Sequence, residues 1–441
     1  MNYAASVDYL LSLLGAFRDS QFGLERMERL MAGLGQPDRA FRTIHIAGTN
    51  GKGSTAAMIT SALHAAGRTT GLSTSPHLMR FNERVRLNDA DISDSDFAAA
   101  VEEVRAANES ISAAEGRNMH PTFFETVTAV AFCAFRRAGV EWGVVEVGLG
   151  GRLDATNVVE PELAVITPIA RDHERFLGSG ERSIAREKAG ILKPGCPAVM
   201  SDQMPEAAEE IRGRAGEVGI RLVEAGQAWR TESVTNEAGF YRFDAVPGAD
   251  ASGGREAFPV TLGLAGEHQV TNALTAIASL DVLGIETAAI QRGLAEVSWP
   301  GRLERIPGDP EFLLDAAHNP SGATVLARFL REHCGDRTVH LIYGSSNDKP
   351  MEQIAEILFP CADRVVLTAS QVTRSISPED LLNVVGRHHN DVMVRPSIET
   401  ALEWVERHAG PGDLVVVAGS IFLVGEARAA LKQLVAEPVG Q

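Results

Sequence analysis

A glycine-rich segment that contains one lysine, residues 41–55 (FRTIHIAGTNGKGST), has the composition of a phosphate-binding loop. It joins an apolar, strand-like run to residues 54–66, whose alanine content and periodicity predict a helix. Three glycines allow a sharp turn that directs backbone N–H groups and the helix N-terminus toward one point. Lys52 would add a positive charge for the β- and γ-phosphates, and the hydroxyl of Ser54 or Thr55 would reach Mg²⁺.

The spacing of this segment differs from the common phosphate loop, G-x-x-x-x-G-K-[ST]. Gly53 directly follows Lys52, and Ile46 occupies the position of the first glycine. A glycine-rich turn with a solvated lysine is therefore the alternative interpretation. The order of strand, loop, lysine, hydroxyl and helix favours phosphate binding.

Polar residues also occur at the ends of three other predicted strands. They are Ser75 after residues 69–73, Glu146 within the apolar run 143–147, and His173 after residues 163–166. A carboxylate in a buried strand needs a cation or a donor as partner, and Mg²⁺ held by nucleotide phosphates is a natural one. A proline turn at Ser75 and a hydrogen-bonded side chain at His173 are the ordinary alternatives. Their common position at strand ends predicts a single site, because open α/β sheets bind ligands there.

Composition limits the classes of function. The chain has 441 residues, of which 44% are apolar and 22% charged, so we expect two or three globular domains. A net charge of -17 argues against general affinity for nucleic acid or an anionic membrane. The four cysteines are scattered, which fits a reducing cytoplasm and no cysteine metal site. We expect no signal peptide and no membrane span.

The periodicity predicts two α/β units. Helices are expected at residues 7–14, 24–34, 94–108, 123–137, 183–189 and 266–280, with a small antiparallel addition between residues 221 and 264. A linker at 298–304 would separate a first domain, 1–297, from a second, smaller doubly wound domain, 305–441. In the second domain, strands are expected at 311–315, 338–343, 363–367, 391–395 and 413–417, with helices near 320–332, 351–358, 378–386, 397–408 and 424–434. Lys188 would lie on the inner face of its helix if Ile184 packs, although a solvated lysine is the default expectation.

From residue 22 to residue 426 the sequence resembles the folylpolyglutamate synthase and dihydrofolate synthase family, a branch of the Mur-type ATP-dependent amide ligases. The shared motifs are FGLERM (22–27), AGTNGKGS (47–54), SPHL (75–78), EVGLGGRLDATN (146–157), DH (172–173), REKAGI (186–191), HQVTNA (268–273), PGR (300–302), DAAHNP (315–320) and GSIFLVGE (419–426). The resemblance implies a phosphate-loop ATPase domain followed by a Rossmann-like domain. Pro168 and Arg171, near His173, and Pro350 in GSSNDKP depart from the family pattern.

The resemblance also implies roles for individual residues. The ATP phosphates would be held by Thr49, Asn50, Gly51, Lys52, Gly53 and Ser54, and ATP would also contact Asn272, Arg302 and Asp315. Ser75 and Glu146 would ligate one Mg²⁺, and His173, with Glu146 nearby, a second. Lys188 would be carbamylated. The pteroate side would be lined by Thr122, Phe123, Phe124, Glu125, Leu153, Asp154 and Ala155, and the glutamate and phosphate end by His318 and Ser420.

The implied reaction joins L-glutamate to a pteroate or folate carboxylate through an acyl phosphate made from ATP. Lys52, Lys188 and His318 are the expected catalytic residues, in a monomeric cytoplasmic enzyme. A nucleotide-dependent switch that forms no bond is one alternative, although it leaves DAAHNP (315–320) without a role. A cell-wall ligase acting on a UDP-sugar is another, although such ligases usually carry an additional N-terminal domain. The sequence leaves open which of the two glutamate additions occurs.

Overall fold

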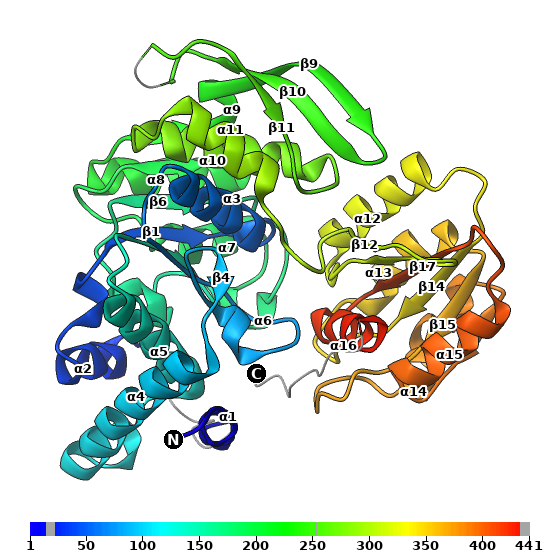
Figure 1. Ribbon diagram of the computed structural model, residues 1–441, viewed down its shortest axis with the longest axis horizontal. Coiled ribbons are helices and arrows are strands. Elements are labelled where there is room, and N and C mark those ends of the chain that lie inside the picture. The colour runs from blue at the N-terminus through cyan, green and yellow to red at the C-terminus, as the bar shows by residue number, and fades with distance from the viewer. Residues whose placement is uncertain (15–22, 252–253, 433–441) are drawn as a thin grey trace.

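Two sheet-based units lie side by side in the computed structural model of the protein (Figure 1). The structure describes residues 1–14, 23–251 and 254–432. The first residue of the FGLERM motif and the last two residues of the predicted helix 424–434 lie outside these ranges. Among the described residues no helix is long and apolar enough to cross a membrane.

The first sheet has eight strands in the order β4-β3-β2-β5-β1-β6-β7-β8. They are β1 (Arg42–Ala47), β2 (Thr70–Ser73), β3 (Val85–Leu87), β4 (Ala90–Asp91), β5 (Trp142–Glu146), β6 (Leu163–Ile166), β7 (Ala198–Met200) and β8 (Leu222–Glu224). The strands β2, β5, β1, β6, β7 and β8 pair with their neighbours in parallel. At one edge, β3 pairs antiparallel with β2 and with β4. The central strand β1 is buried along nearly its whole length, as expected for a sheet covered on both faces.

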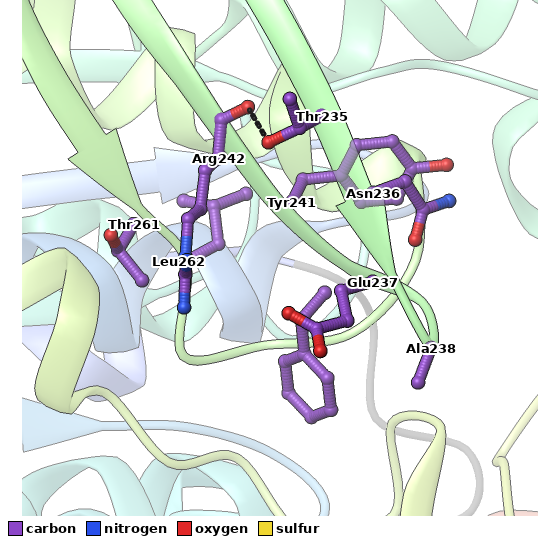
Figure 2. A pocket seen from close by; sticks show the side chains of 9 residues that line it. Thr235, Asn236, Glu237, Ala238, Tyr241, Arg242, Thr261 and Leu262 are labelled. Atoms are coloured by element: carbon purple, nitrogen blue, oxygen red, sulfur yellow. Dashed lines mark hydrogen bonds between the residues drawn. The ribbon is translucent and has the colours of Figure 1, made fainter.

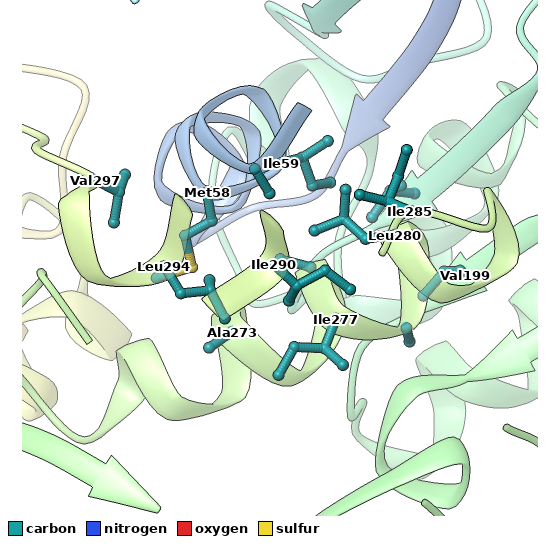
Figure 3. Close-up of a cluster of buried hydrophobic side chains, with 14 of the residues drawn as sticks. Met58, Ile59, Val199, Ala273, Ile277, Leu280, Ile285, Ile290, Leu294 and Val297 are labelled. Carbon is teal, nitrogen blue, oxygen red and sulfur yellow. The ribbon is translucent and has the colours of Figure 1, made fainter. Parts of the chain in front are cut away.

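Helices cover both faces of this sheet. They are α1 (Tyr3–Ser12), α2 (Glu25–Gly33), α3 (Lys52–Ala65), α4 (Asp94–Glu115), α5 (Phe123–Ala138), α6 (Glu174–Leu177), α7 (Glu181–Ala189), α8 (Pro205–Val218), α9 (Ala225–Ala228), α10 (His268–Val282) and α11 (Thr287–Glu296). One face is buried by α3, α10 and α11, whose apolar side chains interlock in Figure 3. The helices α1, α2, α4 and α5 cover the other face near β2 and β5, and α7 and α8 cover it near β6 and β7.

A three-stranded antiparallel sheet lies on the first unit. It consists of β9 (Trp229–Glu237), β10 (Phe240–Pro247) and β11 (Phe258–Thr261), and its hairpin extends toward the second unit in Figure 1. This confirms the predicted antiparallel addition, although residues 222–224, counted within it, form the parallel edge strand β8 of the first sheet.

The second unit has a six-stranded sheet in the order β12-β13-β17-β14-β15-β16. Its strands are β12 (Glu304–Ile306), β13 (Glu311–Leu314), β14 (Val339–Tyr343), β15 (Arg364–Leu367), β16 (Val392–Val394) and β17 (Leu414–Ala418). Its helices are α12 (Pro320–His333), α13 (Met351–Leu358), α14 (Pro378–Val385), α15 (Ile398–His408) and α16 (Ile421–Leu431). All strands are parallel except β12, which pairs antiparallel with β13.

Every predicted strand and helix of the second unit is present within a few residues, so the α/β prediction is confirmed. The antiparallel strand β12 was not predicted, because its first residue, Glu304, was assigned to the linker. The helices α8 and α11 and the hairpin of β3 and β4 were not predicted either. Helix α10 begins at His268, two residues after the predicted start.

The packing of α3 on α11 gives a test of the fold. A Cβ atom on Gly293 of α11 would lie 2.3 Å from the backbone of Ala62 on α3. We therefore expect Gly293→Ala to lower the free energy of unfolding by about 1 to 3 kcal/mol in urea denaturation, because the added methyl overpacks the contact. Gly213→Ala is the matched control, since nothing lies within 4 Å of its Cβ position on the exposed side of α8. That variant should be stabilised by about 0.5 to 1 kcal/mol. Equal effects of the two substitutions would contradict the close packing.

Candidate active site

The carboxyl ends of four neighbouring strands bring the predicted residues to one edge of the first sheet. In the order β2-β5-β1-β6, these ends carry Ser75, Glu146, the phosphate loop and the segment that leads to His173. Such an edge is the ordinary ligand site of an open α/β sheet.

The phosphate loop turns where close contacts require glycine. Gly51 has a φ of 81° and directly precedes α3, and a Cβ there would lie 2.3 Å from Asn272 Oδ1. The backbone N–H groups of Thr49 and Asn50 both donate to the carbonyl oxygen of Pro168, at 3.0 and 3.1 Å. These two amides therefore bind the neighbouring strand end, and the roles of Thr49 and Asn50 in holding phosphate stay predictions. The N–H groups in the first turn of α3 have no acceptor within the helix and point toward the loop.

Lys52 and Glu146 form the charged centre of the site. Lys52 Nζ donates to the carbonyl oxygen of Thr49 at 3.1 Å and lies 3.9 Å from Glu146 Oε1. The backbone N–H of Ser75 donates to Glu146 Oε2 at 3.4 Å. Burial raises the pKa of Glu146, and the charge of Lys52 opposes this shift.

The surroundings of Glu146 fit a divalent cation. The carboxylate is 7% exposed, its contacts with Lys52 and Ser75 are long, and it lines a small pocket together with Ser75. Carboxylate and hydroxyl oxygens are the ligands that Mg²⁺ prefers, and desolvation of Glu146 would be offset by the ion.

Helix α10 contacts the start of α3 through a chain of side-chain hydrogen bonds. Asn272 Nδ2 donates to Gln269 Oε1 at 2.9 Å, and Gln269 Nε2 donates to Ser54 Oγ at 3.3 Å. Trp299 also packs against the loop, because a Cβ on Gly53 would meet its Nε1 at 2.9 Å. Close packing by α10 and Trp299 therefore holds the loop in place.

Lys188 is buried, as expected for an inner position if Ile184 packs, and Ile184 is itself fully buried, so the default of a solvated lysine does not hold. It is 5% exposed on α7, and a Cβ on Gly151 would lie 3.0 Å from its Cα. Burial and then the charge of Lys52 lower the pKa of Lys188 to about 7, against the opposing effect of nearby carboxylates. A large share of this amine is uncharged at neutral pH.

The second unit contributes side chains that approach the phosphate loop. Lys349 Nζ donates to Asp172 Oδ1 at 2.8 Å, and His318 Nε2 lies 3.5 Å from Asp172 Oδ2. Asn319 Nδ2 donates to Asn50 Oδ1 at 3.0 Å and to Asp172 Oδ2 at 3.4 Å. Burial alone would raise the pKa of Asp172, but the hydrogen bond with His318 and the charge of Lys349 hold it well below its usual range.

Asp172, Asn319 and Lys349 were not predicted as site residues. The available signal was the position of Asn319 and Lys349 in polar segments that follow strands of the second sheet. Their partners in the first unit could not be read from the sequence.

His173 is the residue that precedes the short helix α6, it has a φ of 53°, and its side chain is 35% exposed. Burial lowers its pKa to about 4, although Asp172 opposes the shift, so the imidazole is neutral and able to ligate a metal ion. Among residues 1–14, 23–251 and 254–432, no three His, Cys, Asp or Glu side chains cluster closely enough to hold a metal by themselves. An ion at His173 would need phosphate oxygens as additional ligands, which is usual for Mg²⁺.

Asp315 and Ser420 lie at strand ends of the second sheet. Asp315 accepts hydrogen bonds from the N–H groups of Leu303 and Ala317, both at 2.9 Å. Burial raises the pKa of Asp315, and the charge of Arg302 opposes this shift, so the two side chains interact electrostatically. Ser420 is buried and precedes α16. Their contacts with ATP and glutamate stay predictions.

The residues expected to face pteroate divide into two groups. Thr122 and Glu125 cap the start of α5, and Glu125 also binds Arg26 at 3.1 Å. Asp154 accepts hydrogen bonds from Leu149 and Thr156 and so holds its own turn. These polar side chains are occupied by the protein, and Phe123 and Ala155 are buried.

Phe124 is better placed for a ligand. It lines the small pocket with Ser75 and Glu146, and a Cβ on Gly148 would lie 2.3 Å from its ring. Leu153 is partly exposed in the neighbouring loop.

A separate hollow of about 450 Å³ lies on the antiparallel sheet (Figure 2). Its lining includes Asn236, Glu237, Tyr241 and Arg242, together with five further residues of the same sheet and its flanks. None of the predicted site residues borders it, so we do not assign it to the phosphate site.

The burial of Lys188 predicts a pH dependence of stability. Its pKa is about 7 in the folded protein and 10.5 ordinarily, so between these values the unfolded chain binds the proton that the folded protein has released. Lys188 should therefore make stability increase as pH rises through this window, by about 1.4 kcal/mol per pH unit at most. Urea denaturation from pH 7 to 10 in carbonate-free buffer should show this gain in the natural protein relative to Lys188→Met. Parallel pH profiles would contradict the lowered pKa.

Family models match both units of the chain. Residues 46–280 match the Mur ligase middle domain, and residues 301–421 match the glutamate ligase domain of Mur ligases. The dihydrofolate synthase/folylpolyglutamate synthase of Bacillus subtilis is 34% identical over 93% of this chain and 95% of its own length. The folylpolyglutamate synthase of Lacticaseibacillus casei is 32% identical over 98% of this chain and 99% of its own length.

Solved structures agree with these matches. A Mycobacterium tuberculosis folylpolyglutamate synthase complexed with ADP and AMPPCP has a TM-score of 0.88 at 32% identity, covering 98% of this chain and 99% of its own. Escherichia coli FolC in complex with DHPP and ADP has a TM-score of 0.86 at 30% identity, covering 98% of both chains. With its phosphate loop, its two α/β units and these relatives along nearly its full length, the chain belongs to the folylpolyglutamate synthase and dihydrofolate synthase family of Mur-type ATP-dependent ligases.

Proposed function

We propose that this protein is an ATP- and Mg²⁺-dependent amide ligase that adds L-glutamate to dihydropteroate, to the glutamyl tail of a folate, or to both. The observation that carries the proposal is the meeting of the two units at the phosphate loop, where Asn319 and Lys349 contact Asn50 and Asp172. A nucleotide switch has no need for a second domain at this place, whereas a ligase must bring a second substrate to the phosphorylated acid.

The residues of the loop would carry the first half of the reaction. A carboxylate is a poor electrophile, so its oxygen attacks the γ-phosphate of ATP and forms an acyl phosphate with release of ADP. Lys52 and the N–H groups at the start of α3 would bind the phosphate oxygens and stabilise the charge of the transferring group. The acceptor acid would lie beside Phe124, near Ser75 and Glu146.

The second unit would carry the second half. The glutamate amine attacks the acyl carbon, and phosphate leaves from a tetrahedral intermediate as the amide forms. His318 and Ser420 would orient glutamate on the edge of the second sheet. Because water would hydrolyse the acyl phosphate, the approach of the two units to one another also protects the intermediate.

Two Mg²⁺ ions are part of the proposal, held by Ser75 and Glu146 and by His173 with Glu146 nearby. Mg²⁺ would supply neutralisation of the phosphate charge. Lys188 would be carbamylated, which is supported by its burial and by a pKa of about 7, since only the uncharged amine reacts with carbon dioxide. Asn272, Arg302 and Asp315 would contact ATP, and Arg302 and Asp315 would do so from the connection and the second unit.

We propose further that residues 1–297 and 305–441 are the two domains, joined by residues 298–304, with Glu304 already in the second sheet. The match to the first family model ends at residue 280 and the match to the second begins at residue 301, which supports this division. We also propose a monomer that acts in the cytoplasm, where its free cysteines fit a reducing environment.

Phosphate release tests the function. With ATP, Mg²⁺ and glutamate, we expect release to require an acceptor, either dihydropteroate or tetrahydrofolate, and each acceptor tested alone assigns one of the two reactions. Lys52→Ala should reduce turnover at least about 100-fold, because a charge that stabilises the transferring phosphoryl group is lost. Circular dichroism should show that this variant remains folded.

Two outcomes would reject the proposal. Phosphate release that does not depend on glutamate would favour a nucleotide switch. Near-normal amide formation by Lys52→Ala would remove the assignment of the phosphate loop.

The carbamate on Lys188 can be tested without turnover. In buffer with carbon-13 bicarbonate, we expect a carbamate carbon signal in the NMR spectrum of the natural protein and its loss in Lys188→Met. Lys193→Met is the matched control, because Lys193 is a nearby lysine whose Nζ already donates to the carbonyl oxygens of Asn157 and Val159. A signal that persists in Lys188→Met and disappears in Lys193→Met would show that Lys193 is modified, and would contradict the carbamate on Lys188.

A further inference from the structure

Residues 75–80, which we call the docking loop, link the phosphate site to the core of the second unit. The loop leaves β2 with Ser75 and returns to β3 through a short 3₁₀ helix, Phe81–Arg84. The beginning of the loop and its tip have different surroundings.

The beginning of the loop belongs to the phosphate site. The N–H of Ser75 donates to Glu146 Oε2, and Ser75 and Glu146 line the same pocket. The N–H of Thr74, just before the loop, donates to the carbonyl oxygen of Arg84 at 3.1 Å.

The tip of the loop is packed in the second unit. Leu78 and Met79 are each 8% exposed, and both belong to an apolar cluster whose other members, including Phe312 and Val424, all come from the second unit. A Cβ on Gly425 of α16 would lie 1.9 Å from the carbonyl oxygen of Leu78, so the loop and the helix touch through their backbones.

The carboxylate of Glu83 holds the tip of the loop through backbone hydrogen bonds. Glu83 accepts hydrogen bonds from the N–H groups of Leu78, Met79 and Arg80, at 2.6, 3.0 and 3.0 Å for the closest contact of each. A tip fixed in this way moves together with the rest of the loop. A shift of α16 is therefore transmitted toward Ser75, because packed interiors do not absorb displacements.

We infer that Leu78 and Met79 are positioning residues that act through Ser75, so that the placement of the second unit determines how well Mg²⁺ and nucleotide phosphate are held. This inference rests on the proposed role of Ser75. The coupling is reciprocal, so Mg²⁺ with nucleotide should also stabilise the docked loop.

A double-mutant cycle tests the inference by binding alone. The variants are Leu78→Ala, Ser75→Ala and the two together, and the quantity measured is the Kd of AMPPCP by calorimetry, with Mg²⁺ and with EDTA. We expect Leu78→Ala to weaken binding about fivefold or more with Mg²⁺ and to leave it nearly unchanged in EDTA. The double variant should bind no more weakly than Ser75→Ala, because Leu78 acts through Ser75.

Leu402→Ala is the matched control. Leu402 is a buried leucine of the same cluster on α15 of the second unit, so its truncation should lower stability without removing a side chain of the docking loop. Its Kd should equal that of the natural protein under both conditions. Gly425→Ala tests the same contact from the second unit, and should reproduce the Mg²⁺-dependent loss if Leu78→Ala fails to fold.

The outcomes separate the two proposals. Additive effects of Leu78→Ala and Ser75→Ala, or an equal loss in Leu402→Ala, would overturn the positioning role. A Ser75→Ala variant whose binding depends on Mg²⁺ as in the natural protein would instead overturn the proposed role of Ser75 in the function itself.

Discussion

The carboxylate of Glu146, at the end of a buried parallel strand, is stabilised by the ammonium group of Lys52, 3.9 Å away. A carboxylate buried there without a cation would lose its solvation and become protonated. Burial, together with the charge of Lys52, lowers the pKa of Lys188 to about 7. The site is therefore a set of charged groups held close together and largely removed from water. An anionic nucleotide and a divalent cation would change the electrostatic environment of each group.

The architecture places these charges between two units. Parallel strands bring Ser75, Glu146 and the phosphate loop to one edge of the first sheet, and the second sheet presents its own strand ends on the opposite side. The bond from Lys349 to Asp172 is a direct link between the two edges, with both side chains less than one-tenth exposed. The proposed reaction, in which two substrates meet away from water, would take place in this contact region.

The sequence predicted the fold well where local pattern decides it. The alternation of strands and helices, the phosphate loop before α3 and the strand-end positions of Ser75, Glu146 and His173 follow from periodicity and from the geometry of parallel sheets. The sequence left the burial of Lys188 open, because it depends on how Ile184 and the rest of α7 pack. The partners of Asn50 and Asp172 lie in the other unit, and no local pattern reveals contacts at that separation. The residue roles taken from family resemblance stay predictions, and Glu125 and Asp154 are engaged within the protein.

The hydrogen bond between Asn50 and Asn319 joins residues that are 269 positions apart in the chain. One belongs to the phosphate loop and the other caps the first helix of the second unit. Each half of the molecule therefore completes a surface of the other, so the halves are not independent modules. Consider a hybrid of the first half of this chain and the second half of a relative at about one-third identity. Such a hybrid would have to fold and also to form this contact. Residues on the two sides of this contact should therefore vary together as such proteins diverge.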